Sequence, residues 1–251
     1  MYGQNISTIG TQKDLSDLKG NPLYQDIDFD YLVAHERKST RNPNLGYTPK
    51  GTVSTNSGIT VGMGVDLARV TLNYYNGKYT ADGTQISKGL YDKIQPYSGY
   101  YKNGEKQFGL RGQDAINATA NTGSGTLDQR RNVQLTLKET KELNNAKFSF
   151  VYNKVKKDYD DLIGTTSGSF NSLSSEMKTT LLSMGWNMGE NFIRSGKNNK
   201  RDYYNTLVGG HLTGDFTRFS KVLQGNKWSH RSRRNDEGKY LERSLNAKVR
   251  P

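Results

Sequence analysis

The most distinctive segment of this chain is Ser57-Gly58-Ile59-Thr60-Val61-Gly62-Met63-Gly64-Val65-Asp66. Glycines interleave with β-branched and apolar residues, and a carboxylate ends the run. Glycine inside a strand usually marks a bend or a close approach of another group to the backbone. We therefore predict a strand or hairpin over 58–66 that carries Thr60 and Asp66.

A lone acidic residue, Glu36, precedes this stretch. Phe29, Leu32 and Val33 stand at helical spacing before it, which predicts a short helix that places Glu36 at or just past its C-terminal end. No other Asp or Glu occurs between Glu36 and Asp66. An isolated glutamate there is either functional or a solvated residue at a helix end.

Paired carboxyl groups are the usual requirement for glycoside hydrolysis. One donates a proton to the leaving oxygen, and the other activates water or stabilises the oxocarbenium charge. Glu36 is the best candidate for the proton donor in this sequence.

Composition limits the architecture and the chemistry. The chain has 251 residues and is 32% hydrophobic, with a mean hydropathy of −0.85, which favours two smaller cores over one large core. The absence of cysteine excludes disulfides, thiolate nucleophiles and zinc–thiolate sites. His35, His211 and His230 are too scattered to form a metal-ligand pattern, so we expect neither a metal nor a cofactor.

The formal net charge is +12 and the isoelectric point is about 9.6, which favours polyanions such as nucleic acid, anionic lipid or an acidic cell wall. Solubility alone is the plainer explanation. The sequence has no run of 18 apolar residues, so we expect no membrane insertion. It also begins without a secretory signal, so we expect synthesis in the cytoplasm without a standard signal peptide, or a domain cut from a longer chain.

Four segments follow from composition and periodicity. They are an irregular lead-in over 1–25, an N-terminal lobe over 26–70, a Tyr/Gly/Asn-rich insertion with short irregular elements over 71–128, and a helical lobe over 129–251. A capping-box pattern at 136–139 opens a long helix that breaks at 164–168, and Ser174 caps the next one. Further helices are expected over 203–208, 216–223 and 235–245.

Several motifs together resemble a known superfamily. Glu36, Gly46-Tyr47 and the 58–64 run resemble the active-site stretch of phage-type lysozymes, and the whole run to Leu67 is more similar to pesticin-like and secretion-effector muramidases. The segment 181–189 and the segment from Trp228 to Glu237 are similar to two helices of that family. The likeness covers about 26–66 and 130–245, and leaves 1–25 and 70–127 unexplained.

The resemblance implies an α+β, lysozyme-like fold. A small N-terminal lobe with a Gly-rich β-hairpin and a larger, mainly helical C-terminal lobe would flank a cleft. It also implies hydrolysis of the β-1,4 bond between N-acetylmuramic acid and N-acetylglucosamine in peptidoglycan. Glu36 matches the general acid, and Thr60 matches the threonine that positions water or contacts the sugar.

The second carboxylate departs from the family pattern. Phage-type lysozymes carry an aspartate in the loop after the glutamate, and this loop has none. Either Asp66 does that work from the end of the hairpin, or the site depends mainly on Glu36. Asp66 is alternatively structural, tying the hairpin to the interlobe helix through backbone hydrogen bonds.

Substrate contacts are expected from Tyr47, Gly58, Gly62 and Asn187, although an Asn-x-Gly that ends a helix is commonly a C-cap. Two interpretations stay open for Arg231, Arg233, Arg234 and Glu237, a helix-surface ion-pair set near the N-terminal lobe or a solvated face. The tyrosines of the insertion either stack on glycan rings or form an adhesive or partner-docking surface.

The expected partners are peptidoglycan glycan strands, with an immunity protein or a delivery apparatus as a further possibility, and the expected place of action is the periplasm or the cell wall. We expect no nucleic-acid partner. Two other function classes stay open. One is a non-catalytic wall-binding module on a lysozyme-like fold, motivated by the missing loop aspartate. The other is a basic nucleic-acid-binding protein, motivated by charge alone.

Overall fold

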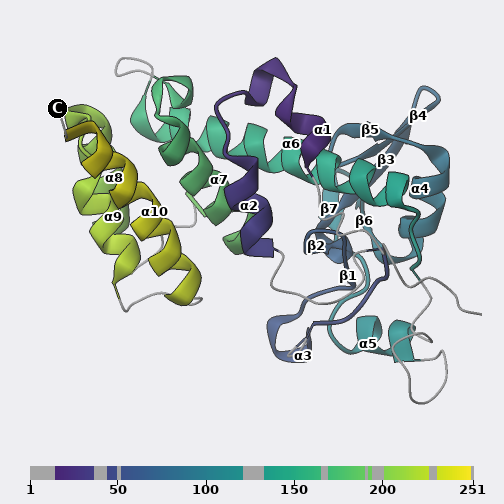
Figure 1. Ribbon diagram of the computed structural model, residues 1–251. Helices are drawn as coiled ribbons and strands as arrows, with labels where there is room; N and C mark the ends of the chain where they lie inside the picture. Colours follow the sequence, from purple (N-terminus) through teal and green to yellow (C-terminus); the bar gives the residue numbers. More distant parts are fainter. Residues whose placement is uncertain are drawn as a thin grey trace, which may run out of the picture. The chain divides into compact units, whose positions relative to one another are not determined.

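The computed structural model describes residues 15–36, 44–49, 52–120, 133–164, 169–189, 192–193, 201–225 and 231–249. These residues form many helices and two small sheets, so the expected α+β class is confirmed (Figure 1). The chain divides into two compact units, the first made of 1–18 and 36–147 and the second of 19–35 and 148–251. The cleft between lobes and the segment boundaries derived from the sequence stay predictions.

The lead-in contains regular structure. Helix α1 spans Ser16–Lys19 and the 3-10 helix η1 spans Pro22–Tyr24. The side chain of Asn21 accepts a hydrogen bond from the Leu23 N–H and proline opens the turn, which is a favourable helix start. The expected irregularity is therefore wrong for 15–25, and residues 1–14 lie outside the described residues.

A short hairpin forms the centre of the first unit. Strand β1 (Thr60–Val61) pairs antiparallel with β2 (Val65–Asp66), and η2 (Leu67–Arg69) follows directly. Gly62 and Gly64 turn the chain with φ of +62° and +90°, a region that favours glycine. The apolar residues of the hairpin are buried, and the Met63 N–H donates to Asn144 Oδ1 at 3.0 Å.

The insertion forms a five-stranded sheet of order β5-β4-β3-β6-β7, so the expectation of irregular elements is wrong there. The strands are β3 (Thr71–Tyr75), β4 (Lys78–Ala81), β5 (Thr84–Ile86), β6 (Gly99–Lys102) and β7 (Glu105–Gln107). Asn-Gly or Asp-Gly turns at 76–77, 82–83 and 103–104 have positive φ at both residues, as tight hairpins require. β3 and β6 are parallel neighbours and the other pairs are antiparallel.

Helices precede, interrupt and follow these strands in the sequence. They are α3 (Thr52–Thr55), α4 (Lys88–Ile94), which continues into η3 (Gln95–Tyr97), α5 (Gln113–Ala120) and α6 (Leu137–Ile163). The predicted capping box is confirmed, because the Thr136 N–H donates to Glu139 Oε2 at 2.7 Å and the Glu139 N–H donates to Thr136 Oγ1 at 3.2 Å. α6 ends at the predicted break, where Gly164 has φ of +79°.

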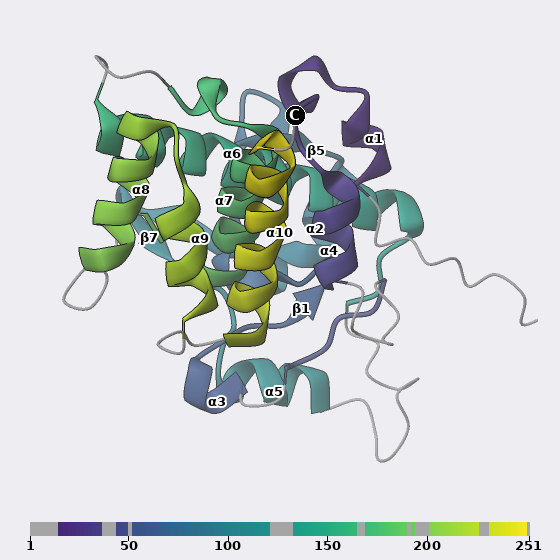
Figure 2. The same cartoon turned by 60° about the vertical axis from the view of Figure 1, so that its left-hand side comes forward.

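The second unit is helical in its described part. It contains most of α2 (Phe29–Glu36) and the C-terminal part of α6, then η5 (Phe170–Ser172), α7 (Ser175–Met188), α8 (Arg201–Thr213), α9 (Thr217–Gln224) and α10 (Arg231–Val249). Ser174 caps α7 as predicted. α10 packs on α9 and α7 (Figure 2). None of the helices in the described ranges is long and apolar enough to cross a membrane.

Candidate active site

Glu36 is the last residue of α2, which confirms the predicted position of its backbone at the C-terminal end of that helix. Its side chain lies outside the described part of the structure. Its role as proton donor therefore stays a prediction.

The hairpin brings three of the predicted site residues into one row. Thr60 is paired with Asp66 on one side, and on the other side it exchanges two backbone hydrogen bonds with Tyr47, at 2.9 and 2.7 Å. Directly opposed residues of antiparallel strands have Cβ atoms about 4.5–5.5 Å apart and on the same face. The side chains of Tyr47, Thr60 and Asp66 therefore share one face, with Thr60 buried and the other two half-buried.

Asp66 has a structural function through one oxygen. Its Oδ1 accepts the N–H groups of Gly58 at 3.0 Å and Ala68 at 3.1 Å, and the second of these bonds caps η2. Its Oδ2 lies 3.3 Å from Arg69 Nε. Burial raises the pKa of Asp66, while Arg69 and the two N–H donors act to lower it. Two backbone N–H groups, of Gly58 and Ala68, thus orient the carboxylate, and Lys147 of α6 also acts to lower its pKa.

Gly58 and Gly62 have packing reasons to be glycine. A Cβ on Gly58 would lie 2.5 Å from both Asp66 Oδ1 and the Ala68 Cβ. A Cβ on Gly62 would lie 2.3 Å from Asn144 Oδ1, on a backbone with positive φ. Their contact with substrate stays a prediction, whereas their contribution to the shape of the hairpin follows from these close approaches.

Two residues that support the site were missed in the sequence. Arg69 follows Asp66 at i,i+3, a spacing that could have indicated an ion pair. Asn144 holds the Met63 N–H from α6, and nothing local in the sequence signals a partner 81 positions away. Both fix the hairpin from outside the glycine-rich run.

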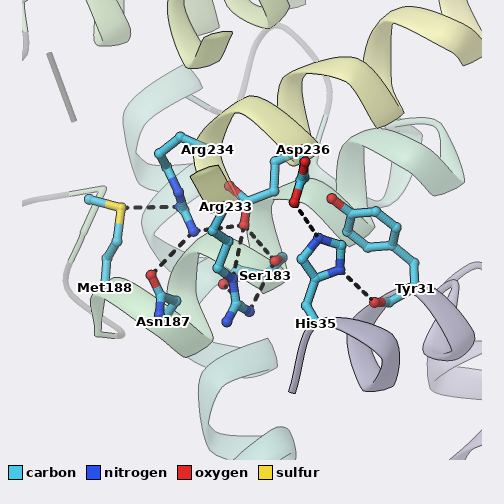
Figure 3. Close-up of polar contacts among 9 residues, drawn as sticks. Tyr31, His35, Ser183, Asn187, Met188, Arg233, Arg234 and Asp236 are labelled. Atoms are coloured by element: carbon cyan, nitrogen blue, oxygen red, sulfur yellow. Dashed lines mark hydrogen bonds and ion pairs between the residues drawn. The ribbon is translucent and has the colours of Figure 1, made fainter. Parts of the chain in front are cut away.

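A buried ionic cluster occupies the second unit between α7 and α10 (Figure 3). Arg234 and Glu237 have no exposed surface and approach to 2.7 Å, and Ser183 donates to the same Glu237 Oε1 at 2.5 Å. Arg233 reaches that oxygen at 3.4 Å. The expectation of a surface ion-pair set or a solvated face is wrong for Arg234 and Glu237, because α10 turns this side of its charged sequence against α7.

Asn187 belongs to this cluster. Its Oδ1 accepts a hydrogen bond from Arg234 Nη2 at 3.4 Å, and α7 ends directly after it at Met188, with Gly189 as C-cap at φ of +94°. The C-cap alternative is confirmed for Gly189. Asn187 lies in the second unit and the hairpin in the first, so its contact with substrate stays a prediction.

The histidines have neighbours of their own. His35 Nδ1 lies 3.0 Å from the Tyr31 carbonyl oxygen and its Nε2 lies 3.8 Å from Asp236 Oδ2, as Figure 3 shows. His211 contacts the Tyr159 hydroxyl at 2.7 Å. His230 and Trp228 lie outside the described residues. No group of His, Asp and Glu that could hold a metal ion occurs among the residues that the structure describes.

A helix-end glutamate, a glycine-rich hairpin with an opposed threonine and aspartate, and a helical second unit are consistent with the class of lysozyme-like proteins. The family comparison is more specific. Residues 26–203 match the family described as Pesticin, a bacterial toxin homologue of phage lysozyme, C-terminal part, and the chain belongs to this family. The match includes Glu36, Thr60, Asp66 and Asn187. No curated protein matches the chain. Membership supports a peptidoglycan hydrolase-like role in general terms.

Proposed function

We propose that this protein is a muramidase that cleaves the β-1,4 bond between N-acetylmuramic acid and N-acetylglucosamine in peptidoglycan. The observation that carries the proposal is the pairing of Thr60 with Asp66 across the hairpin, in a chain whose match to a family of lysozyme homologues also includes Glu36. The hairpin thereby presents a hydroxyl and a carboxylate on one face, which is the pair needed to handle a water molecule.

In this mechanism Glu36 donates a proton to the leaving oxygen of the glycosidic bond. Asp66 Oδ2 accepts a proton from the attacking water or stabilises the positive charge that develops on the sugar, while Thr60 orients the water. Burial raises the pKa of Asp66, which makes its carboxylate a better proton acceptor. The bonds from Gly58 and Ala68 to Oδ1 hold the carboxylate in one orientation, so that little reorganisation accompanies the reaction.

A second candidate function is supported by the same contacts. Because Asp66 bonds to two backbone N–H groups and faces Arg69, all of its described interactions serve the fold. A non-catalytic wall-binding protein would retain these contacts. Such a protein would bind purified wall and release no soluble fragments.

The direct test measures the loss of turbidity of purified cell wall with the Glu36→Gln variant. We expect a loss of activity of about 100-fold or more, because the proton donor is removed. Glu105→Gln is the matched control, since it makes the same change at an exposed position of β7 and should retain activity. Wall clearing that Glu36→Gln leaves unchanged would remove Glu36 from the mechanism.

The site of action follows from the substrate. A muramidase must reach the periplasm or the wall, so we propose that the protein is released or delivered there, and that an immunity protein protects the cell that produces it. The proposal of an immunity protein is tested by co-expressing a protein encoded next to this one and measuring whether it protects the wall from digestion.

A further inference from the structure

Two similar hairpins lie side by side in the insertion. Each carries a pair of tyrosines shortly before an Asn-Gly turn, Tyr74-Tyr75 in β3 and Tyr100-Tyr101 in β6. Because β3 and β6 are parallel neighbours, both hairpins run in the same direction. The four tyrosines are exposed, which is unusual for side chains of this size on a packed sheet.

Strand alternation assigns one tyrosine of each pair to each face of the sheet. Tyr74 faces the side of α4, since it stacks on Tyr79 at a centroid distance of 4.7 Å and Tyr79 contacts Tyr91 of α4 at 4.9 Å. Tyr100 is aligned with Leu72 and therefore shares that side. Tyr75 and Tyr101 point to the opposite side, which we call the open face.

The open face has a distinct chemistry. Tyr75 and Tyr101 are 75% and 55% exposed. Amide, hydroxyl and ammonium groups surround the two rings, and the strands contribute no carboxylate to this face. The polar members, by alternation and register, are Asn73, Lys78, Thr80, Gln85 and Lys106.

We propose that the open face binds a glycan strand of peptidoglycan at sugars away from the bond that is cut. The proposal rests on the proposed function for its ligand. A sugar ring presents C–H groups on its faces and hydroxyls on its rim, which match flat aromatic rings with polar side chains between them. Lys78 and Lys106 complement the carboxylates of the strand's stem peptides, and Lys106 Nζ also donates to the Arg69 carbonyl oxygen at 3.1 Å.

The composition of the face favours a glycan over other macromolecules. Two lysines are few for a nucleic-acid backbone, whose binding depends on neutralising many phosphates. The face has no aliphatic side chain, whereas the centre of a protein interface is usually apolar. A second contact on the same polymer would hold the enzyme near its substrate through a raised effective concentration.

The test is co-sedimentation with purified peptidoglycan sacculi. All variants carry Glu36→Gln, so that the strands stay intact during the measurement. Tyr75→Ala with Tyr101→Ala should weaken binding about tenfold, or about threefold for each ring removed. Tyr100→Ala is the matched control, since Tyr100 is 51% exposed, adjoins Tyr101 in β6 and faces the other side. It should leave binding within twofold, and thermal unfolding midpoints should be equal for all variants.

The outcomes separate this inference from the proposed function, because cleavage of the same sacculi is measured with Glu36 intact. Suppose that the protein with Glu36 intact cleaves the sacculi, and that the Tyr75→Ala, Tyr101→Ala variant binds them as tightly as Glu36→Gln alone. This result overturns only the inference about the open face, which would then be assigned to binding a protein partner. Equal losses of binding to sacculi in Tyr100→Ala and Tyr101→Ala also overturn the inference, because the effect would not be specific to one face of the sheet. Sacculi that the protein neither binds nor cleaves overturn both.

Discussion

At the scale of single residues, the two carboxylate oxygens of Asp66 have different contacts. Oδ1 accepts the backbone N–H groups of Gly58 and Ala68, and Oδ2 faces Arg69. Asparagine would preserve the Oδ1 acceptor but remove the charge. A substitution at this position can therefore separate a structural contribution from a chemical one.

We predict that Asp66→Asn lowers wall hydrolysis about 100-fold or more, because the proposed mechanism requires this carboxylate to accept a proton from water or to stabilise charge on the sugar. Thermal unfolding should change little, since the amide oxygen still accepts the two N–H bonds. Asp92→Asn, at an exposed acid of α4, is the control and should keep full activity. Hydrolysis that survives in Asp66→Asn would assign Asp66 to the fold alone.

Glu237 determines a pH dependence of stability. Burial raises its pKa from 4.5 to about 7, although Arg234, Ser183 and Arg233 act to lower it. The folded state therefore retains a proton that the unfolded chain releases between these two values. The stability contributed by this group is fully present below pH 4.5 and is lost as the pH rises through about 7.

The measurement is the free energy of unfolding in urea at several pH values. The wild-type protein should lose stability across this window relative to Glu237→Gln, whose side chain does not titrate. Parallel pH profiles for the two proteins would show that Glu237 keeps its ordinary pKa in the folded state.

At the scale of elements, the ends of helices were predictable and the insertion was not. Thr136, Glu139, Ser174 and Gly164 act through neighbours within four positions, so their pattern is visible in the sequence. The tyrosine and glycine content of 71–107 indicates irregular structure, whereas the segment contains three turn signals and forms a five-stranded sheet. Those Asn-Gly and Asp-Gly turns mark hairpins more reliably than composition does.

The contacts of the candidate site are likewise of two kinds, local ones that the sequence indicates and non-local ones that it does not. The row formed by Thr60 and Asp66 follows from a local hairpin, whereas Tyr47 reaches Thr60 across 13 positions and Asn144 reaches Met63 across 81. Arg234 and Glu237 pair at i,i+3, which is a local spacing, but their burial depends on α7, which supplies Ser183 from more than 50 positions away. Non-local contacts of this kind have no signature in one sequence.

Close approach of α6 and α7 depends on Gly185. A Cβ there would lie 2.6 Å from Val155 Cγ2 and 3.1 Å from Val151 Cγ1. We predict that Gly185→Ala lowers the free energy of unfolding by about 1–3 kcal/mol through overpacking. Gly209→Ala in α8 meets no atom within 4 Å and should raise it by about 0.4–1 kcal/mol. Chemical denaturation measures both, and a loss of stability in both variants alike would contradict this account.

At the scale of the whole molecule, we expect the net charge of +12 to strengthen binding to an anionic wall. Raising the ionic strength from about 0.1 to 1 M shortens the Debye length from about 10 to about 3 Å. We predict that binding of the Glu36→Gln variant to sacculi weakens several-fold over this range. Binding that does not change with salt would mean that contacts with uncharged sugars account for the affinity, and that the net charge does not contribute to wall binding.

Mass spectrometry of peptidoglycan digested by the protein distinguishes a muramidase from other wall hydrolases. We predict soluble fragments with a new reducing end at N-acetylmuramic acid, absent from digests made with Glu36→Gln and present in those made with Glu105→Gln. A new reducing end at N-acetylglucosamine, or freed peptides with intact glycan strands, would contradict this prediction.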